Sequence, residues 1–180
     1  MTSPSPDTPF PPLPPGRVDE FEGLGQDPDL DVDVDDSTGT ERPVHLRWRF
    51  IGLVTLGGTI GTGLREALAL SFPAAPGSVP LTILLINVVG AFALGLLLES
   101  LMRRGPDAGR RRDLRLLIGT GVLGGFTTYS ALAVDTATLL GDALPIAIAY
   151  GVGSVVLGAV ASWAGITGGA ALHRRSEAAS

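Results

Sequence analysis

The chain has 180 residues, of which 45% are hydrophobic, and a formal charge of −5 at pH 7. It contains no cysteine, which excludes disulfides and thiolate chemistry, and its two histidines make a weak basis for a metal site or a catalytic triad. The charge is unevenly divided. Residues 1–41 carry eleven acidic side chains and one arginine, whereas the rest carries seven acidic side chains and twelve arginines. The sequence therefore joins an acidic tail to a basic body.

Residues 1–46 are rich in proline, aspartate, serine and threonine. A segment of this composition has too little apolar surface to offset the conformational entropy that it would lose on folding. The composition therefore predicts a disordered tail. The tail lacks a basic start followed by an apolar segment, and this argues against a cleaved signal peptide.

From residue 47 onward, long apolar runs alternate with short joints that contain proline and glycine. The runs cover roughly 50–72, 79–102, 114–140 and 143–172. Each exceeds the ~20 residues with which a helix crosses the hydrocarbon core of a bilayer. The pattern predicts an all-α membrane protein with four transmembrane helices over residues 47–172 and a short cytoplasmic C-terminal tail over 173–180.

The first run contains Gly57 and Gly61 four residues apart, a spacing typical of close helix packing. Arg65 and Glu66 stand late in the same run. They form either an interfacial charge pair or part of a functional site, and the sequence favours neither.

The second run places Asn87 about eight residues from its start, with apolar neighbours on both sides. Its amide must find a partner inside the protein, either on another helix or in a polar ligand. An amide with two N–H donors at that depth suits an anion.

The third run contains the stretch GVLGGFTTYSALAVD, residues 121–135, with glycine and threonine pairs near its middle. Both residue types weaken a helix. A break would free carbonyls for a cation and N–H groups from the following half-helix. Gly121 and Gly125 also have the spacing typical of close helix packing. The alternative to a break is a continuous helix with a glycine packing face.

The fourth run spaces Tyr150, Ser154 and Gly158 by four residues, so they share one helical face. This face offers two hydroxyl donors beside a gap without a side chain.

The stretches GGTIGTGLRE, INVVGAFALGLLLE and GVLGGFTTYSALAVD resemble the signatures of the Fluc/CrcB fluoride channels. The resemblance covers residues 50 to about 165. It implies a dimer of antiparallel four-helix subunits with two narrow fluoride pores, and a structural sodium ion bound by backbone carbonyls at the third-helix break.

Carried onto this sequence, the sodium carbonyls fall on Gly124 and Thr127. The ion pathway falls on five residues: Arg65, Asn87, Tyr129, Tyr150 and Ser154. Gly158 stands where a third hydroxyl is often seen, and Asp135 where glutamate is usual. The family pattern has two phenylalanines after the break; here the first is Tyr129 and the second is Leu132.

The function expected is passive, fluoride-selective export across the cell membrane, with no enzymatic activity and no nucleic-acid partner. Two alternatives are a non-conducting partner subunit of a heterodimeric fluoride channel and a small proton-coupled drug transporter. The transporter would need an isolated carboxylate deep in the first helix, whereas Glu66 lies late and beside Arg65.

With four spans, eleven arginines lie on one side and none lies in the two opposite joints. They are Arg42, Arg47, Arg49, Arg103, Arg104, Arg110, Arg111, Arg112, Arg115, Arg174 and Arg175. The positive-inside rule places this side and both termini in the cytoplasm. A subunit held in one orientation cannot supply its own inverted partner, which predicts a heterodimer with a paralogous subunit of opposite charge bias.

Overall fold

The computed structural model describes residues 32–34, 41–43, 47–75 and 77–178. The chain divides into two units, Met1–Val44 and His45–Ser180. In the first, strands β1 (Val32–Val34) and β2 (Glu41–Pro43) pair antiparallel, with Val34 opposite Glu41. At these six residues the structure has paired strands where the sequence predicted disorder. The other residues of the predicted tail up to residue 46 lie outside the described part.

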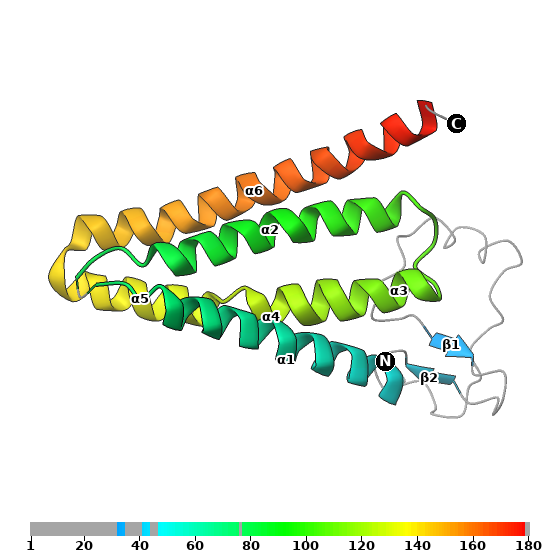
Figure 1. Cartoon of the computed structure of the whole chain (residues 1–180), viewed down its shortest axis with the longest axis horizontal. Coiled ribbons are helices and arrows are strands. Elements are labelled where there is room, and N and C mark those ends of the chain that lie inside the picture. The colour runs from blue at the N-terminus through cyan, green and yellow to red at the C-terminus, as the bar shows by residue number, and fades with distance from the viewer. Residues whose placement is uncertain (1–31, 35–40, 44–46, 76, 179–180) are drawn as a thin grey trace, which may run out of the picture. The chain divides into compact units, whose positions relative to one another are not determined.

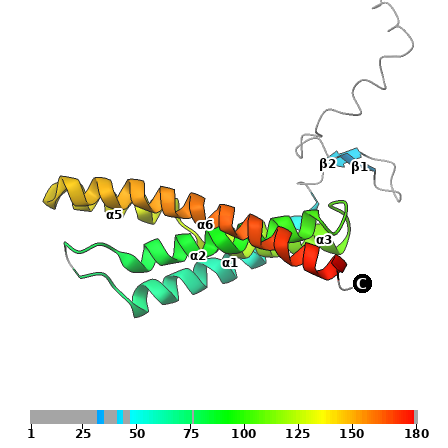
Figure 2. The same cartoon turned by 90° about the horizontal axis from the view of Figure 1, so that it is seen from above.

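The second unit is a set of long helices that run side by side (Figures 1 and 2). They are α1 (Trp48–Ser71), α2 (Leu81–Met102), a composite third helix and α6 (Leu144–Ala178). Among the described residues, three segments are long and apolar enough to cross a membrane, namely Leu81–Met102, Arg110–Gly141 and Leu144–Arg175. The all-helical membrane class is confirmed for this unit.

Helix α1 is not one of those three segments, because its glycines, threonines and the Arg65–Glu66 pair lower its apolar character. It has 24 residues, which at about 1.5 Å per residue gives roughly 36 Å, enough for a hydrocarbon core of about 30 Å. Its glycine face packs against the third helix along this length.

The third helix is built from four pieces in succession. They are α3 (Arg110–Leu114), the π-helix η3 (Arg115–Leu123), α4 (Gly124–Phe126) and α5 (Tyr129–Asp142). Thr127 and Thr128 have extended backbone dihedrals, with ψ of 155° and 119°, so the helix is interrupted between α4 and α5. The predicted break is confirmed, and the alternative of a continuous third helix is wrong.

The crossing of α1 with η3 and α4 is made by glycine against glycine. A Cβ atom on Gly57 would overlap the carbonyl oxygen of Leu117, and one on Gly61 would overlap that of Val122. In return, Cβ atoms on Gly121 and Gly125 would meet the backbone of Gly57 and Gly58. The predicted packing role of both glycine pairs is confirmed.

Helices α2 and α6 are held at a similarly short separation. A Cβ atom on Gly95 would overlap the carbonyl oxygen of Ser162, and one on Gly165 would overlap that of Phe92. Such close backbone approach is how helices gain packing where the lipid gives no hydrophobic driving force between them. It fixes α2, the helix that carries Asn87, against α6.

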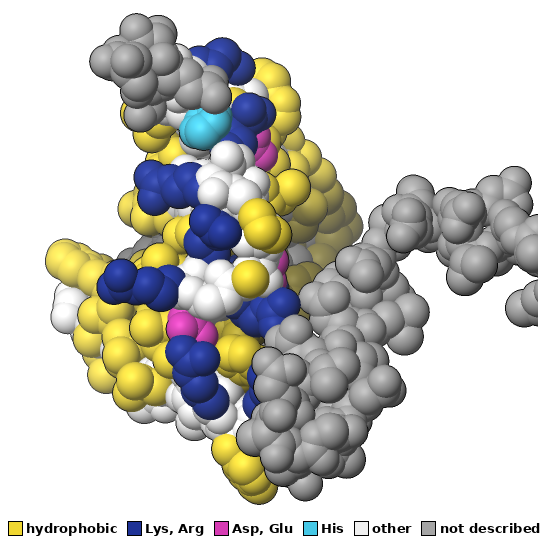
Figure 3. Space-filling view, turned by 90° about the vertical axis from the view of Figure 1, so that its right-hand side faces the viewer, with side chains coloured by type: hydrophobic (Ala, Val, Ile, Leu, Met, Phe, Trp, Pro, Cys, Tyr) yellow, Lys and Arg dark blue, Asp and Glu magenta, His cyan; other side chains and the backbone are white. Residues whose placement is uncertain are grey.

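Helix α6 continues to Ala178 and so includes most of the residues 173–180 that the sequence assigned to a tail. Its C-terminal end lies at the same end of the bundle as the start of α1, the end of α2 and all of α3 (Figure 1). Arginine side chains are spread over this end (Figure 3), which we call the arginine end.

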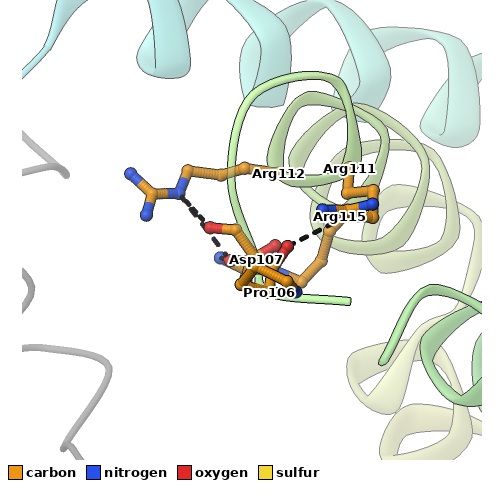
Figure 4. A network of polar contacts seen from close by, with 5 residues as sticks. All are labelled: Pro106, Asp107, Arg111, Arg112 and Arg115. Carbon is orange, nitrogen blue, oxygen red and sulfur yellow. Dashed lines mark hydrogen bonds and ion pairs between the residues drawn. The ribbon is translucent and has the colours of Figure 1, made fainter. Parts of the chain in front are cut away.

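The joint between α2 and α3 at the arginine end is tied by its own side chains (Figure 4). Arg115 Nε donates to Asp107 Oδ2 at 2.9 Å, and Arg111 Nε donates to the carbonyl of Pro106 at 2.9 Å. Gly109, directly before α3, has a φ of 55°, which side chains of L-residues rarely adopt. These contacts set the angle at which the third helix leaves the joint.

Candidate functional site at the break in the third helix

The two threonines at the break cap the half-helices on either side of it. Thr127 directs both its backbone N–H and its hydroxyl to the carbonyl of Leu123, at 3.0 and 2.9 Å. Thr128 is the N-cap of α5, and its hydroxyl oxygen accepts from the N–H of Ala131 at 3.2 Å. The Thr128 hydroxyl therefore satisfies a backbone N–H that the break would otherwise leave unpaired, and the Thr127 hydroxyl adds a second bond to a carbonyl of the last turn before the break.

Asn87 on α2 faces the break and binds Thr128 twice. The N–H of Thr128 donates to Asn87 Oδ1 at 2.8 Å, and Asn87 Nδ2 donates to the carbonyl of Thr128 at 3.0 Å. The sequence expected Asn87 to offer two donors to an anion. In the structure one of its two N–H groups is already engaged, and one remains for a ligand.

The break also leaves carbonyl groups free. Among the described residues, no hydrogen bond reaches the carbonyls of Gly124, Phe126 or Thr127 from beyond the break, while that of Gly125 accepts from Thr62 Oγ1 at 3.4 Å. Gly124 is exposed on the surface of the bundle. Carbonyl oxygens of unwound backbone can coordinate sodium, so the predicted residues Gly124 and Thr127 fit such an ion in donor type.

The predicted polar face of α6 lines a groove. Tyr150 and Ser154 are both buried, with 5% of each residue exposed. They contribute to a groove of about 390 Å³ that is otherwise lined by apolar residues from α6, from the turn before α2 and from α2 itself. Gly158 has open space where a side chain would stand.

Both hydroxyls on this face already have acceptors within the chain. Ser154 Oγ donates to the carbonyl of Tyr150 at 2.6 Å, and the Tyr150 hydroxyl donates to Asp135 Oδ2 at 3.3 Å. A ligand that uses these hydroxyls as donors must take them from these acceptors. The structure thus joins Asp135, the acidic residue after the break, to the polar face of α6.

The two positions where the family pattern has phenylalanine differ in their surroundings. Leu132 is buried and packs in a cluster with Leu139, Ala147 and Tyr150 between α5 and α6. Tyr129 is 80% exposed and stands on the outside of the bundle. The single chain therefore covers Leu132 and leaves Tyr129 for lipid or another subunit.

Arg65 is half-buried on α1, and its Nε is a buried donor with no hydrogen-bond partner among the described residues. It follows Gly61 by about one helical turn, and Gly61 lies against Val122 and the N–H of Phe126. The adjacent Glu66 is exposed, and no ion pair joins it to Arg65 among the described residues. The interfacial pair that the sequence left open is not formed.

Comparison with known proteins gives the same family as the motifs. The family described as CrcB-like protein, Camphor Resistance (CrcB), matches residues 52–166. The chain belongs to the CrcB family.

Several curated relatives of this CrcB chain are named as fluoride-specific ion channels. It is 51% identical to "Fluoride-specific ion channel FluC 2" of Leifsonia xyli subsp. xyli over 74% of this chain and 92% of the relative. It is 49% identical to "Fluoride-specific ion channel FluC 1" of Cutibacterium acnes over 63% of this chain and 80% of the relative. It is 40% identical to "Fluoride-specific ion channel FluC" of Mesorhizobium japonicum over 63% of this chain and 90% of the relative. These names agree with the prediction that the chain is not an enzyme.

The structure brings several predicted residues of this CrcB chain together and adds others. Asn87 meets the break directly, and Tyr150 and Ser154 form a second polar group that includes Asp135. Sequence reasoning missed Thr128 as a site residue. Its signal was the tandem Thr127–Thr128, since threonine is a common N-cap residue and a break needs caps on both sides.

Proposed function

We propose that the chain is a subunit of a fluoride-selective ion channel. The main support for this proposal is the break in the third helix, with capped half-helices and the half-buried amide of Asn87, in a chain whose relatives are named fluoride-specific ion channels. Irregular backbone inside a membrane survives only where it is buried in protein or lines a polar cavity. A hydrolytic or redox activity would not need this arrangement.

Fluoride is strongly hydrated, so a pathway must replace its water with good hydrogen-bond donors. The donors proposed for this pathway are the free N–H of Asn87 and the hydroxyls of Tyr150 and Ser154. The two hydroxyls now donate to a carboxylate and to a backbone carbonyl, and both can rotate to an anion. Aromatic ring edges, which carry partial positive charge, can add to this set, and Tyr129 is the exposed aromatic residue next to the break.

A structural sodium ion is proposed at the carbonyls of Gly124 and Thr127. These groups suit a hard cation because they are oxygen ligands without charge, and the break leaves them without helical donors. When bound, the ion would neutralise the negative ends of several carbonyl dipoles in a region of low dielectric constant. Neither Gly124 nor Thr127 contributes a titratable group, so the site needs no proton exchange.

The proposed assembly is an antiparallel dimer in the cell membrane. The outer face of the break, with Gly124, Tyr129 and Ser130, is exposed in the single chain. Polar backbone and a tyrosine at membrane depth are better placed against a second subunit than against lipid. The arginine bias favours a paralogous partner of opposite orientation, and the numbered names of several relatives fit genomes with more than one such protein.

The direction of transport follows from acid–base chemistry rather than from an energy source. Undissociated HF crosses the membrane and ionises in a more alkaline cytoplasm, and a passive channel lets the trapped anion leave. Both termini face the cytoplasm in this proposal.

A second role is favoured by Leu132, which fills the α5–α6 core without offering an aromatic ring. The chain would then complete the pore of a paralogous subunit without conducting through its own. Growth in fluoride separates the two roles. The chain is expressed alone, and with its paralogue, in a bacterium that lacks fluoride channels. Resistance from the pair, reduced by Ser154→Ala in this chain, supports conduction through its own residues, because the Ser154 hydroxyl bonds only within its own helix. Unchanged resistance with that variant supports the accessory role, and no resistance in either case contradicts the proposal.

A further inference from the structure

We propose that Asn87 is a positioning residue that keeps the carbonyl of Gly124 free by holding the N–H of Thr128 away from it. In a continuous α-helix the N–H of residue 128 donates to the carbonyl of residue 124. Here that N–H donates to Asn87 Oδ1 at 2.8 Å instead. The inference rests on the proposed function only in assigning the freed carbonyl to sodium.

Asn87 pairs the carbonyl of Thr128 as well as its N–H. Its Nδ2 donates to the carbonyl of Thr128 at 3.0 Å, so both backbone polar groups of one residue are paired with one side chain. Thr128 is 8% exposed, and water does not supply an equivalent partner there. If the amide were removed, the simplest way to pair the N–H of Thr128 would be to close the helix onto Gly124.

The amide is held by a rigid support on α2. Ile86 is buried beside Asn87, and one turn further Gly90 leaves room for the side-chain methyl of Thr127, which a Cβ atom at that position would overlap. Helix α2 is in turn fixed to α6 by the Gly95 and Gly165 contacts. The rest of the bundle therefore holds the Asn87 amide at a fixed place relative to the break, as a positioning residue requires.

This role differs from that of a donor to the conducted anion, and three substitutions separate the two. Asn87→Leu removes both bonds to Thr128. Asn87→Asp keeps an acceptor for the N–H of Thr128 but places an acceptor-rich group beside the anion. Ser100→Ala is the matched control, because Ser100 lies on the same helix and its hydroxyl donates to Leu96 of that helix.

The first measurement is the unfolding midpoint of the full chain, with the paralogue if assembly requires it, as sodium replaces N-methylglucamine at constant ionic strength. A sodium-dependent rise is expected for the wild type and for Ser100→Ala. Asn87→Leu should need roughly 10- to 100-fold more sodium to reach the same rise in the unfolding midpoint, as is typical when a group that orients a metal ligand is lost. Asn87→Asp should stay closer to the wild type in sodium dependence while losing fluoride flux. Wild-type sodium dependence in Asn87→Leu would overturn the proposal.

The second measurement needs neither sodium nor transport. Thr127–Thr128 is the single Thr–Thr pair in the sequence, so carbonyl-¹³C and amide-¹⁵N labelling of threonine isolates the N–H signal of Thr128 by NMR. The signal should be protected from exchange in the wild type, unmoved by Ser100→Ala, and shifted by Asn87→Leu. If Asn87→Leu does not fold, Asn87→Asp and Asn87→Gln serve, since each alters one or both bonds.

The two measurements distinguish the possible failures. A Thr128 signal that is unprotected, or that the Asn87 variants leave unchanged, contradicts the positioning role. A signal that responds as expected in a protein with no sodium dependence keeps the positioning role and removes the cation from the proposed function.

Discussion

At the scale of single residues, the polar groups near the break divide into those that close the backbone and those that remain for an ion. Thr127 and Thr128 cap the two half-helices, and Asn87 pairs the remaining groups of Thr128. What is left is one N–H of Asn87 and the carbonyls of Gly124, Phe126 and Thr127. Substitutions should therefore have different effects according to whether they remove a backbone contact at the break or a donor to an ion.

Thr127→Ser should be tolerated, because serine can make the same bond to the carbonyl of Leu123. Thr127→Pro should abolish flux. Proline lacks the N–H that donates to Leu123 and disfavours the helical conformation of Phe126 before it. Thermal unfolding and fluoride efflux of both variants test this. Equal behaviour of the two would show that the backbone of residue 127 has no role.

Ser154→Ala should lower fluoride flux by about tenfold or more, since a hydrogen bond to a charged group contributes about 1.5–3 kcal/mol. Stability should change little, because the hydroxyl bonds only within its own helix. Thr138→Val is the matched control, as Thr138 bonds the carbonyl of Val134 on the exposed side of α5. Full flux through Ser154→Ala, measured with a fluoride electrode, would remove Ser154 from the pathway.

At the scale of helices, the fold depends on how closely α1 approaches the third helix. Gly57 and Gly121 bring the two backbones into contact, and this contact places Thr62 against the carbonyl of Gly125 and Arg65 one turn beyond Gly61. The side chains of α1 are therefore positioned beside the break by glycines that carry no chemistry of their own.

Adjacent glycines test this crossing. Gly57→Ala should destabilise the protein by at least the roughly 1–3 kcal/mol typical of overpacking, because the new methyl overlaps backbone atoms that cannot rotate away. Gly58→Ala places its methyl in open space and should be neutral or slightly stabilising. Thermal unfolding in detergent compares the pair. If Gly57→Ala is as stable as Gly58→Ala, the two helices are not in glycine contact.

The sequence was sufficient to predict the helices and the break. Apolar length predicts spans, glycine spacing predicts close crossings, and adjacent glycines and threonines predict a weak point in the third helix. It could not predict which donors remain free. The bonds between Asn87 and Thr128, and between Tyr150 and Asp135, join residues on different helices, and only the packed arrangement determines them. Helix α6 also continues to Ala178, beyond the apolar run that ends near residue 172.

At the scale of the whole body, residues 47–178, all arginines except Arg65 belong to the segments that meet at the arginine end of the bundle (Figure 3). Several are paired there, as Arg49 is with Asp113 and Arg115 with Asp107. Ion pairing does not cancel the topological effect, since acidic residues contribute little to the positive-inside rule. The body is therefore expected to insert in one orientation.

This orientation predicts that a tag at the C-terminus is inaccessible from outside intact cells, and that a tag in the joint between α1 and α2 is accessible. Substituting Arg103, Arg104, Arg110 and Arg111 with glutamine should produce a mixed population, because the bias between the two sides is then reduced. C-terminal tags found on both faces of wild-type cells would contradict the expectation and would support a homodimer of subunits inserted both ways.

Selective conduction of fluoride can be measured as efflux from liposomes with ion-selective electrodes. The chain is reconstituted alone and together with the paralogue, and the vesicles are loaded with fluoride and chloride at equal concentration and at the same pH inside and outside. We expect rapid fluoride efflux once a potassium ionophore balances the charge, with chloride retained and no requirement for a proton gradient. Chloride leaving as fast as fluoride, or fluoride moving only when a proton gradient is imposed, would contradict this expectation.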